Sequence, residues 1–383
     1  MAAYGRERAT DHIASLAARG LDLKAFWDEA AEAVSGVVPH YGAPCWFTLD
    51  PASLLVTSHY DHGEIPELPP EWLAKEYYED DVHDMAGVAR SERGISTLHE
   101  ASGGDPSRSP RWQANMQYGG DQELLVALRT RDGDAWGILG LYREPGQPHF
   151  NPEELAFLRA VSTALAEGAR RGLLIGEASE PDAPEAPGLV VLDEHWAVES
   201  LTPGAERRLA ELPDGDWEGQ GTLPPSVLAV AGRALRTAEG ESAPGEVALA
   251  RVLSTEGRWI VLHGASLVGD GAPRVAVIVE AAHPARIVPL LMAAYGLTDR
   301  ERDVTRLVLG GDSTAQIADR LCVSPHTVQQ HLKSVFEKTG VRSRRELVGK
   351  VFFAHYEPRL RDNEVRATED RPLRGGPMSP PPD

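Results

Sequence analysis

The residues best suited to a chemical role share one face of a helix that the sequence predicts from Ser324 onward. A serine hydroxyl caps a first helical turn and proline fits the next position, so Ser324 and Pro325 mark a helix start. The apolar positions repeat on one side of this helix, at Val328, Leu332, Val335 and Phe336. The other side carries polar and basic groups, namely His326, Gln329, Gln330, Lys333 and Ser334. Amide and ammonium groups match base edges and phosphates, which predicts contact with double-stranded DNA.

A shorter helix is predicted immediately before this one. Ser313-Thr-Ala-Gln316 has the spacing of a capping box, in which the serine side chain and the glutamine side chain satisfy each other's backbone amides. The inward positions of the helix are Ile317, Ala318 and Leu321. The turn Cys322-Val323 then leads to Ser324. A helix, a short turn and a second helix form the geometry that places the second helix in a major groove.

Two flanking helices complete the predicted domain. Thr298-Asp-Arg-Glu301 is another capping box, and the helix that it opens ends at Gly310-Gly311, where glycine takes the left-handed conformation. This helix carries Val304, Leu307 and Val308 on one face. A last helix, from about Ser343 to Phe353, carries Leu347, Val348, Val351 and Phe352. The pattern predicts an all-α four-helix domain over residues 296–355.

The net charge of −20 does not argue against DNA binding, because the charge is unevenly distributed. Residues 296–355 hold ten Lys and Arg against seven Asp and Glu, a net charge of +3, so the rest of the chain carries −23. Phosphate contacts need Lys and Arg, and this segment supplies them. An acidic region held close to DNA opposes binding, which suggests control by the rest of the chain.

Four motifs in this segment resemble the helix-turn-helix domain of the LuxR/NarL/FixJ family in order and spacing. They are Leu297-Thr-Asp-Arg-Glu-Arg-Asp-Val, Ile317-Ala-Asp-Arg-Leu, Val323-Ser-Pro-His-Thr-Val-Gln-Gln-His-Leu and Lys338-Thr-Gly-Val-Arg-Ser-Arg-Arg-Glu-Leu347. The resemblance implies a bacterial transcription regulator that binds DNA as a homodimer, with the fourth helix often forming the dimer contact. It covers about 60 of the 383 residues.

The resemblance also implies roles for individual positions. Gln329, Gln330 and Lys333 match positions that face the bases, whereas Thr327, Ser334 and Lys338 match positions near phosphates. Together with the exposed face of the helix, this gives the expected DNA-binding set of Ser324, His326, Thr327, Gln329, Gln330, Lys333, Ser334 and Lys338.

Residues 1–176 are expected to form a sensor domain. Helical periodicity around Ile13, Leu16, Leu21, Phe26 and Ala33 precedes strands at 45–49 and 54–59. Two clearer strands at 123–129 and 135–142 flank the turn Thr130-Arg-Asp-Gly-Asp134, and a helix from Pro152 to about Leu174 follows. This order resembles an α+β GAF domain in architecture, without sharp motifs.

The remaining segments complete the multidomain organisation. Residues 177–188 are rich in Pro, Ala and acids and are expected to form a linker. Residues 189–285 predict strands at 188–192, 197–199, 246–253, 258–265 and 274–280 with a helix at 205–212. This order resembles an α+β PAS domain that either binds a ligand or only dimerises. A connecting helix is expected at 286–295 and a disordered tail at 356–383.

Two further sets of residues allow a chemical interpretation. Histidines and acids gather in two places, at His59, Asp61, His62, Glu64, Asp80, Asp81, His83 and Asp84. Their spacing matches no defined site, so we expect no metal and no cofactor. Six aromatic residues either line a small-molecule pocket of the sensor domain or form ordinary core: Trp46, Phe47, Trp72, Tyr77, Tyr78 and Trp112.

Composition excludes several classes of protein. No apolar run approaches the roughly 18 residues of a membrane span, so we expect no membrane association. The first residues show no secretory signal, and Cys45 and Cys322 suggest no disulfide, so a cytoplasmic location is expected. No Ser/His/Asp or Cys/His arrangement stands out, so no enzymatic activity is expected. The alternative to a DNA-binding regulator is a signal-binding or partner-binding scaffold with a vestigial helix-turn-helix.

Overall fold

The computed structural model describes residues 2–60, 76–173, 187–217, 219–242, 246–267, 273–282, 292, 295–309, 311–344 and 346–347. The chain divides into two compact units, one of Met1–Gly176 and Ala186–Glu280 and one of Glu177–Glu185 and Ala281–Asp383. The expected linker at 177–188, connecting helix at 286–295 and tail at 356–383 lie wholly or mostly outside the described residues. Among the described helices, none combines the length and apolar character needed to cross a bilayer.

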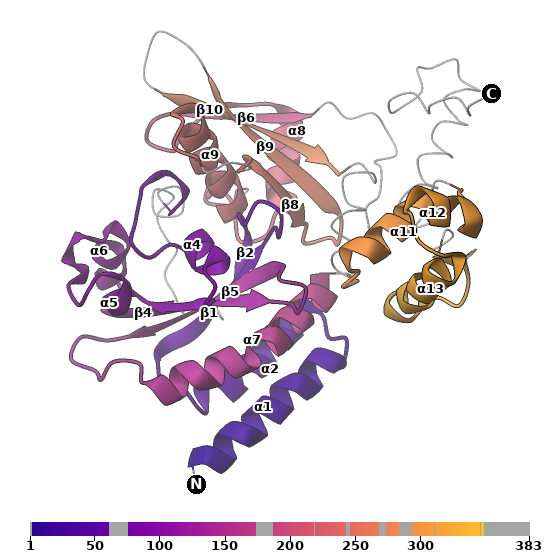
Figure 1. Ribbon diagram of the computed structural model, residues 1–383. Helices are drawn as coiled ribbons and strands as arrows, with labels where there is room; N and C mark the ends of the chain where they lie inside the picture. The colour runs from indigo at the N-terminus through magenta and orange to yellow at the C-terminus, as the bar shows by residue number, and fades with distance from the viewer. Residues whose placement is uncertain are drawn as a thin grey trace. The chain divides into compact units, whose positions relative to one another are not determined.

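The first unit begins with a five-stranded sheet in the order β2-β1-β5-β4-β3 (Figure 1). Its strands are β1 (Tyr41–Leu49), β2 (Val56–Tyr60), β3 (Ile95–Thr97), β4 (Gln122–Arg129) and β5 (Ala135–Arg143), and neighbours pair antiparallel. Alternate side chains enter two different cores: Trp46 and Leu124 lie on one face, Phe47 and Leu125 on the other. Burial of both faces explains why β4 is a continuous apolar run instead of an alternating one.

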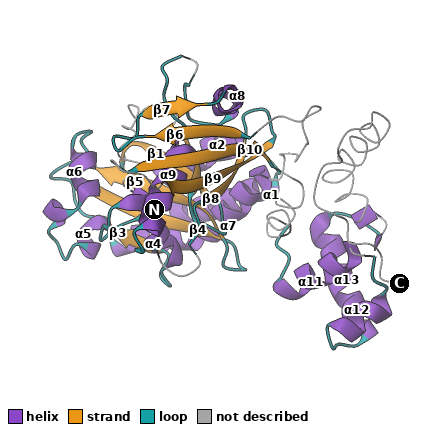
Figure 2. Ribbon diagram, turned by 90° about the horizontal axis from the view of Figure 1, so that it is seen from above, coloured by secondary structure: helices purple, strands orange, loops and turns teal. Residues whose placement is uncertain are grey.

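Helices α2 (Leu23–Ser35) and α7 (Pro152–Leu173) cover one face of this sheet, and α1 (Ala2–Ala18) packs on both of them (Figure 1, Figure 2). The helical periodicity expected near the N-terminus therefore belongs to two helices, α1 and α2. They are separated at Gly20, whose φ is +68°. Asp22 starts α2, because its side chain accepts a hydrogen bond from the Ala25 amide at 2.9 Å. At Gly168 any Cβ would lie 2.0 Å from the Phe26 ring, so glycine permits the close approach of α7 and α2.

Short elements that the sequence analysis did not predict lie between β2 and β4. They are α4 (Met85–Arg90), α5 (Leu98–Ala101), the 3₁₀ turn η1 (Pro106–Arg108) and α6 (Pro110–Met116). Met85 and Val88 place α4 in the core on the face opposite α7. With fewer than eight residues each, these helices give too short a periodic signal to be recognised from sequence.

A second five-stranded sheet follows in the order β7-β6-β10-β9-β8. Its strands are β6 (Gly188–Leu192), β7 (Val198–Leu201), β8 (Leu249–Leu253), β9 (Trp259–Leu267) and β10 (Arg274–Ala281), with helices α8 (Pro203–Glu211) and α9 (Pro225–Ala238). The expected strands and α8 are observed to within a few residues. The sequence analysis missed α9, whose N-cap residue Pro224 provides no side-chain cap. The likeness of this segment to a PAS domain stays a prediction.

The two sheets share one continuous apolar cluster, in which Leu55 and Val56 of the first sheet region join Val227, Val252 and Ile260 of the second. Strand β2 contacts both α9 and β8. At this junction the Asp50 carboxylate is fully buried and accepts hydrogen bonds from the backbone amide and Nε of Arg251, both at 2.9 Å. The same carboxylate accepts from the amides of Ala52 and Ser53 in its own turn.

The second unit contains α11 (Asp299–Leu309), α12 (Thr314–Arg320) and α13 (Pro325–Thr339), which pack around a separate core. Four side chains in this core are fully buried: Val304, Ile317, Val328 and Val335. Of the expected fourth helix only the start is described. There the Ser343 hydroxyl accepts from the Glu346 amide at 3.1 Å.

We predict that Asp50→Ala destabilises the junction of the two sheets by about 3 to 5 kcal/mol, because it leaves the Arg251 charge and two turn amides without their acceptor. The measurement is urea denaturation of the full chain followed by tryptophan fluorescence. The control is Glu256→Gln, which removes an exposed partner of Arg258 and is expected to cost less than about 1 kcal/mol. Equal effects of the two substitutions would contradict a structural role for the buried pair.

Candidate nucleic-acid interface

Helix α13 begins where the sequence predicted. The Ser324 side chain accepts from the Thr327 amide at 3.0 Å, and Pro325 occupies the first turn. The helix ends at Gly340, which has φ of +68°. Its buried side consists of Val328, Leu332 and Val335, with Phe336 partly buried.

The exposed side of α13 presents the predicted base-facing groups. His326, Gln329, Gln330 and Lys333 are all exposed, and 81% of the Lys333 side chain is accessible. The Gln330 amide nitrogen lies 3.2 Å from His326 Nε2, one turn earlier. This contact holds the Gln330 amide in one orientation and leaves its second N–H and its oxygen available. A glutamine amide in this state still offers a donor and an acceptor side by side, as an adenine edge requires.

Ser334 and Lys338, two of the positions expected near phosphates, bind the start of α11. The Ser334 hydroxyl donates to Glu301 Oε1 at 2.6 Å. Lys338 Nζ donates to Glu301 Oε2 and to the Gly296 carbonyl oxygen, both at 2.7 Å. The third such position, Thr327, is half-buried, with its hydroxyl 2.8 Å from that of Ser324. These side chains were predicted from sequence, but their intramolecular partners were not.

Glu301 joins a local cap to this tertiary contact. Its side chain accepts from the Thr298 amide at 2.8 Å and its amide donates to the Thr298 hydroxyl at 3.4 Å, which confirms the predicted capping box. Burial alone would raise the pKa of the Glu301 carboxyl. Hydrogen bonds from Lys338, Ser334 and the Thr298 amide outweigh burial and hold the pKa below its ordinary value of 4.5.

The turn between α12 and α13 has a defined helix-ending geometry. Helix α12 opens with the predicted Ser313–Gln316 capping box. After it, the Val323 amide donates to the Ala318 carbonyl and the Cys322 amide to the Asp319 carbonyl, at 2.9 and 3.2 Å. This is a Schellman motif, whose left-handed position is usually glycine. Here Cys322 occupies it with φ of +54°.

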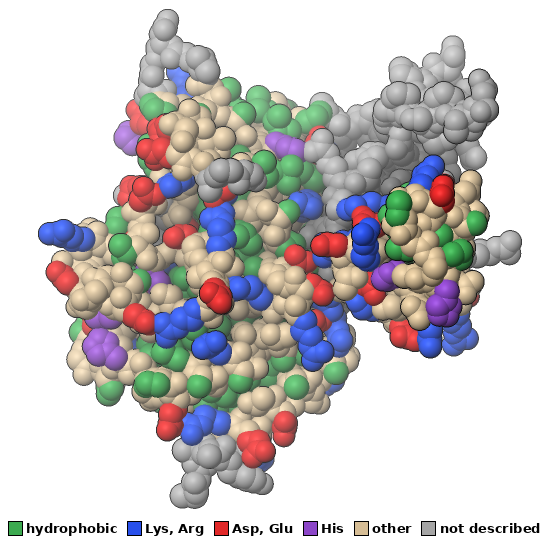
Figure 3. Space-filling model, viewed as in Figure 1, with side chains coloured by type: hydrophobic (Ala, Val, Ile, Leu, Met, Phe, Trp, Pro, Cys, Tyr) green, Lys and Arg blue, Asp and Glu red, His purple; other side chains and the backbone are tan. Residues whose placement is uncertain are grey.

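The charge around the exposed face is mixed. Lys333 Nζ lies 4.0 Å from Glu337, an exposed pair one turn apart that contributes little to stability. The face of the helical unit visible in Figure 3 likewise carries Lys and Arg beside Asp and Glu side chains. A DNA contact by Lys333 would break this weak pair with Glu337, so the net gain in binding free energy is smaller than that of the contact alone.

The histidines and acids of the sensor segment lie in separate environments. Both ring nitrogens of the buried His83 have partners, the Glu123 carboxylate and the Ser96 carbonyl oxygen, each at 3.1 Å. Asp81 accepts from the Ser109 hydroxyl, and Asp84 caps α4. The described residues contain no group of three or more His, Cys, Asp or Glu placed to hold a metal ion. Asp61, His62 and Glu64 lie outside the described residues.

The aromatic residues considered as a pocket lining do not share one cavity. Trp46 stacks on Trp27 with ring centroids 4.5 Å apart, on the helix-covered face of the sheet. Phe47 points to the opposite face and stacks on His59. Trp112 donates to Asp121, and Trp72 lies outside the described residues. Of the set, Tyr77 lines a pocket described below.

Two segments match the models of known families. Residues 296–351 match the family described as bacterial regulatory proteins, luxR family. Residues 28–168 match the GAF domain. These matches confirm the resemblance of the C-terminal helices and of the first sheet and its helices. The domain boundaries stay predictions.

Two relatives each match a short part of this chain. An HTH-type transcriptional regulator of Mycobacterium bovis is 58% identical over 52 residues, which cover 14% of this chain and 6% of that protein. The HTH-type transcriptional regulator MalT of Serratia proteamaculans is 39% identical over 61 residues, 16% of this chain and 7% of its own. This chain thus spans less than a tenth of the length of these relatives. A solved phage VqmA–DPO complex covers 46% of this chain and 84% of its own at 16% identity, but its TM-score of 0.17 supports no argument.

We predict that Glu301→Gln weakens the packing of α11 on α13 by about 1 to 3 kcal/mol near neutral pH, because it removes a charged acceptor of three hydrogen bonds. A depressed folded pKa means that this stabilisation is complete above the unfolded pKa near 4.5 and is lost as the pH falls through the folded pKa. Hydrogen exchange of α11 and α13 amides in the full chain should therefore differ between wild type and variant at neutral pH and converge in acid. Glu337→Gln, on the exposed side of α13, is the control. Identical exchange in wild type and Glu301→Gln at neutral pH would contradict this role.

A second prediction concerns the turn before α13. Cys322→Gly should stabilise the helical unit by up to about 1 kcal/mol, because glycine adopts positive φ without the steric cost of a Cβ. Cys322→Val should destabilise it, whereas Cys322→Ala tests loss of the thiol with the Cβ retained. Amide exchange of α12 and α13 measures all three. The expected order of stability of the helical unit is Gly above Ala above Val at position 322. A different order would show that the thiol, and not the backbone conformation, determines the change in stability.

Proposed function

We propose that this protein is a DNA-binding transcription regulator that inserts α13 into the major groove. The observation that carries the proposal is the exposed face of α13, which presents His326, Gln329, Gln330 and Lys333 while the opposite face is buried. The luxR-family match of residues 296–351 and the names of the relatives support it.

The geometry suggests different roles for the eight expected DNA-binding residues. Gln329, Gln330 and Lys333 present free donors and acceptors and are proposed to contact bases, with His326 orienting Gln330. Ser324, Thr327 and Ser334 use their hydroxyl groups within the protein. Lys338 has one N–H beyond its two internal hydrogen bonds, and this is the group that we propose for a phosphate.

The rest of the chain is proposed to control this interface. We assign residues 1–176 to a GAF sensor for a small molecule, 189–285 to a PAS-like domain and 296–355 to the DNA-binding domain, with no enzymatic activity. The chain is proposed to act in the cytoplasm as a homodimer, so that two α13 helices contact half-sites one helical turn apart. The acidic sensors, which hold most of the −23 charge outside residues 296–355, oppose DNA binding when held close to DNA.

The proposal is tested by selecting bound fragments from a random DNA pool with the full chain, in the presence and absence of candidate ligands. Enrichment of an inverted repeat, bound with steep salt dependence, is the expected result. A folded chain that enriches no sequence and binds DNA without salt dependence would favour the scaffold with a vestigial helix-turn-helix.

We predict that Lys333→Ala lowers affinity for the selected site by about 1 to 3 kcal/mol and reduces the salt slope by about 1, because one cationic contact is lost. The measurement is fluorescence anisotropy against salt concentration. Arg306→Ala on α11 is the matched control, since Arg306 is also exposed and carries the same charge. Equal losses in the two variants would mean that net charge, not α13, determines binding.

A further inference from the structure

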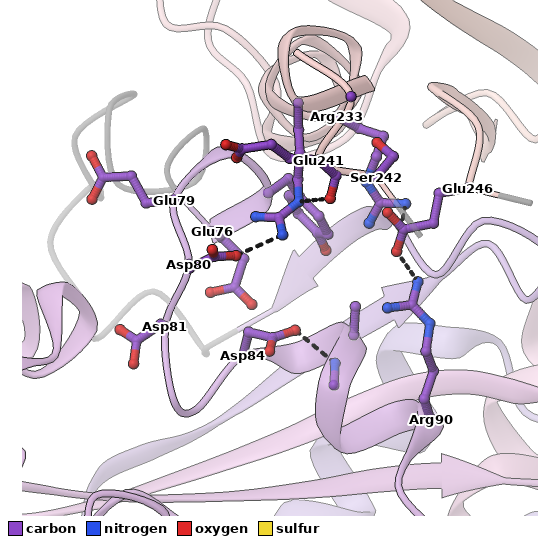
Figure 4. A pocket seen from close by; sticks show the side chains of 15 residues that line it. Glu76, Glu79, Asp80, Asp81, Asp84, Arg90, Arg233, Glu241, Ser242 and Glu246 are labelled. Carbon is purple, nitrogen blue, oxygen red and sulfur yellow. Dashed lines mark hydrogen bonds and ion pairs between the residues drawn. The ribbon is translucent and has the colours of Figure 1, made fainter. Parts of the chain in front are cut away.

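A pocket of about 300 Å³ lies between the two sheets' domains in the first unit (Figure 4). One wall is the segment from Glu76 to Arg90, which leads into and includes α4. The other wall comes from the end of α9 and from Gly240, Glu241, Ser242 and Glu246. The volume is at the lower end of the range for ligand sites, which suits a molecule of amino-acid size.

The pocket is strongly acidic. Its lining includes seven carboxylates against three guanidinium groups, namely Glu76, Glu79, Asp80, Asp81, Asp84, Glu241 and Glu246 against Arg90, Arg233 and Arg236. Because no three of the described acids are grouped as metal ligands, the excess charge favours an organic cation over a metal ion. Two ion pairs already join the walls, Arg90 with Glu246 and Arg236 with Asp80.

Arg233 is the second and independent feature of the pocket. Only 3% of this residue is exposed, and its guanidinium lies over the Tyr77 ring at 5.5 Å. Within the described part of the chain, its Nε and Nη1 have no hydrogen-bond partner. Nη1 forms an ion pair with Glu246 at 3.5 Å, which is longer than a charge-assisted hydrogen bond. A buried guanidinium with unfilled donors is stabilised by an additional acceptor, and a ligand carboxylate supplies charged acceptor oxygens.

The opposite wall suits a cationic group. The Glu76 carboxylate accepts from the Met85 amide at 2.7 Å and from Arg111, and only 4% of its side chain is exposed. Burial raises the pKa of Glu76 to about 8, against the opposing effect of Arg111, and the negative charge of Asp84 adds to the shift. A ligand ammonium placed beside Glu76 and Asp84 would favour the ionised form of Glu76, because it offsets both the burial and the negative charge of Asp84 that raise the pKa.

We propose that this pocket binds a small basic amino acid, with its carboxylate on Arg233 and its ammonium groups among Glu76, Asp84 and Glu241. The inference rests on the proposed sensor function and names the class of ligand sensed. Because both walls contribute contacts, the bound ligand would hold the first sheet and α9 in one arrangement. Ligand binding needs no DNA, so its failure and the failure of DNA binding are separate results.

The test is calorimetric titration of the full chain with four probes at millimolar concentration. L-lysine and L-arginine carry the carboxylate and the cationic groups, cadaverine lacks the carboxylate, and hexanoate lacks the ammonium groups. L-lysine or L-arginine is expected to bind about ten- to a hundredfold more tightly than cadaverine or hexanoate, as expected for one charged hydrogen-bonded contact. Cadaverine binding as tightly as L-lysine, or no binding by any probe, would overturn the proposal.

Variants locate the site. Arg233→Met keeps the aliphatic packing on Tyr77 and removes the charge, so affinity for the basic amino acid should fall about tenfold or more. Arg258→Met, which removes an exposed arginine that does not line the pocket, should leave it unchanged. If Arg233→Met does not fold, Glu241→Gln on the exposed rim decides, with an expected loss of a few fold. If both variants fold and each binds the basic amino acid as tightly as the wild type, the proposal is overturned. If Arg233→Met does not fold, unchanged affinity in Glu241→Gln overturns it.

Discussion

The helical second unit depends on one buried carboxylate. Glu301 starts α11 through its capping box with Thr298, and the same side chain receives hydrogen bonds from Ser334 and Lys338 on α13. A carboxylate removed from water needs such donors, since its desolvation otherwise exceeds what a single ion pair returns. The result is that the helix proposed to enter the major groove has a fixed position on α11 before any DNA is bound.

The same requirement organises the first unit. Asp50 is buried at the junction of the two sheets and is satisfied only by combining its own turn amides with Arg251, some 200 residues later. The buried Glu123 has Arg111, His83 and Tyr142 as donors, and Arg111 and His83 lower its pKa to about 2 although burial opposes the change. Each of these carboxylates specifies a single packing arrangement, because a displaced partner would leave a buried charge.

Local signals were therefore predictable from sequence, and tertiary partners were not. The caps at Thr298, Ser313 and Ser324 depend on residues within three positions, and the structure reproduces them. The bonds from Ser334 and Lys338 to Glu301 span more than 30 residues, and no periodicity or spacing encodes them. Helix α9 was missed for a related reason: its N-cap residue Pro224 provides no side-chain cap, so no local capping signal marks its start.

These features limit how a signal could act under the proposed function. The helical unit has its own core, its own helix caps and the Glu301–Lys338 contact. We therefore do not expect a sensor to act by folding or unfolding this unit. What the unit does not determine by itself is the spacing of two copies of α13 on DNA, and half-site recognition depends on that spacing. A ligand held between two walls of the first unit changes the free energy of an arrangement of domains, not of the helix-turn-helix fold. Under the proposed function, regulation is therefore expected in the affinity for paired half-sites, in addition to the electrostatic effect of the acidic sensors on DNA binding.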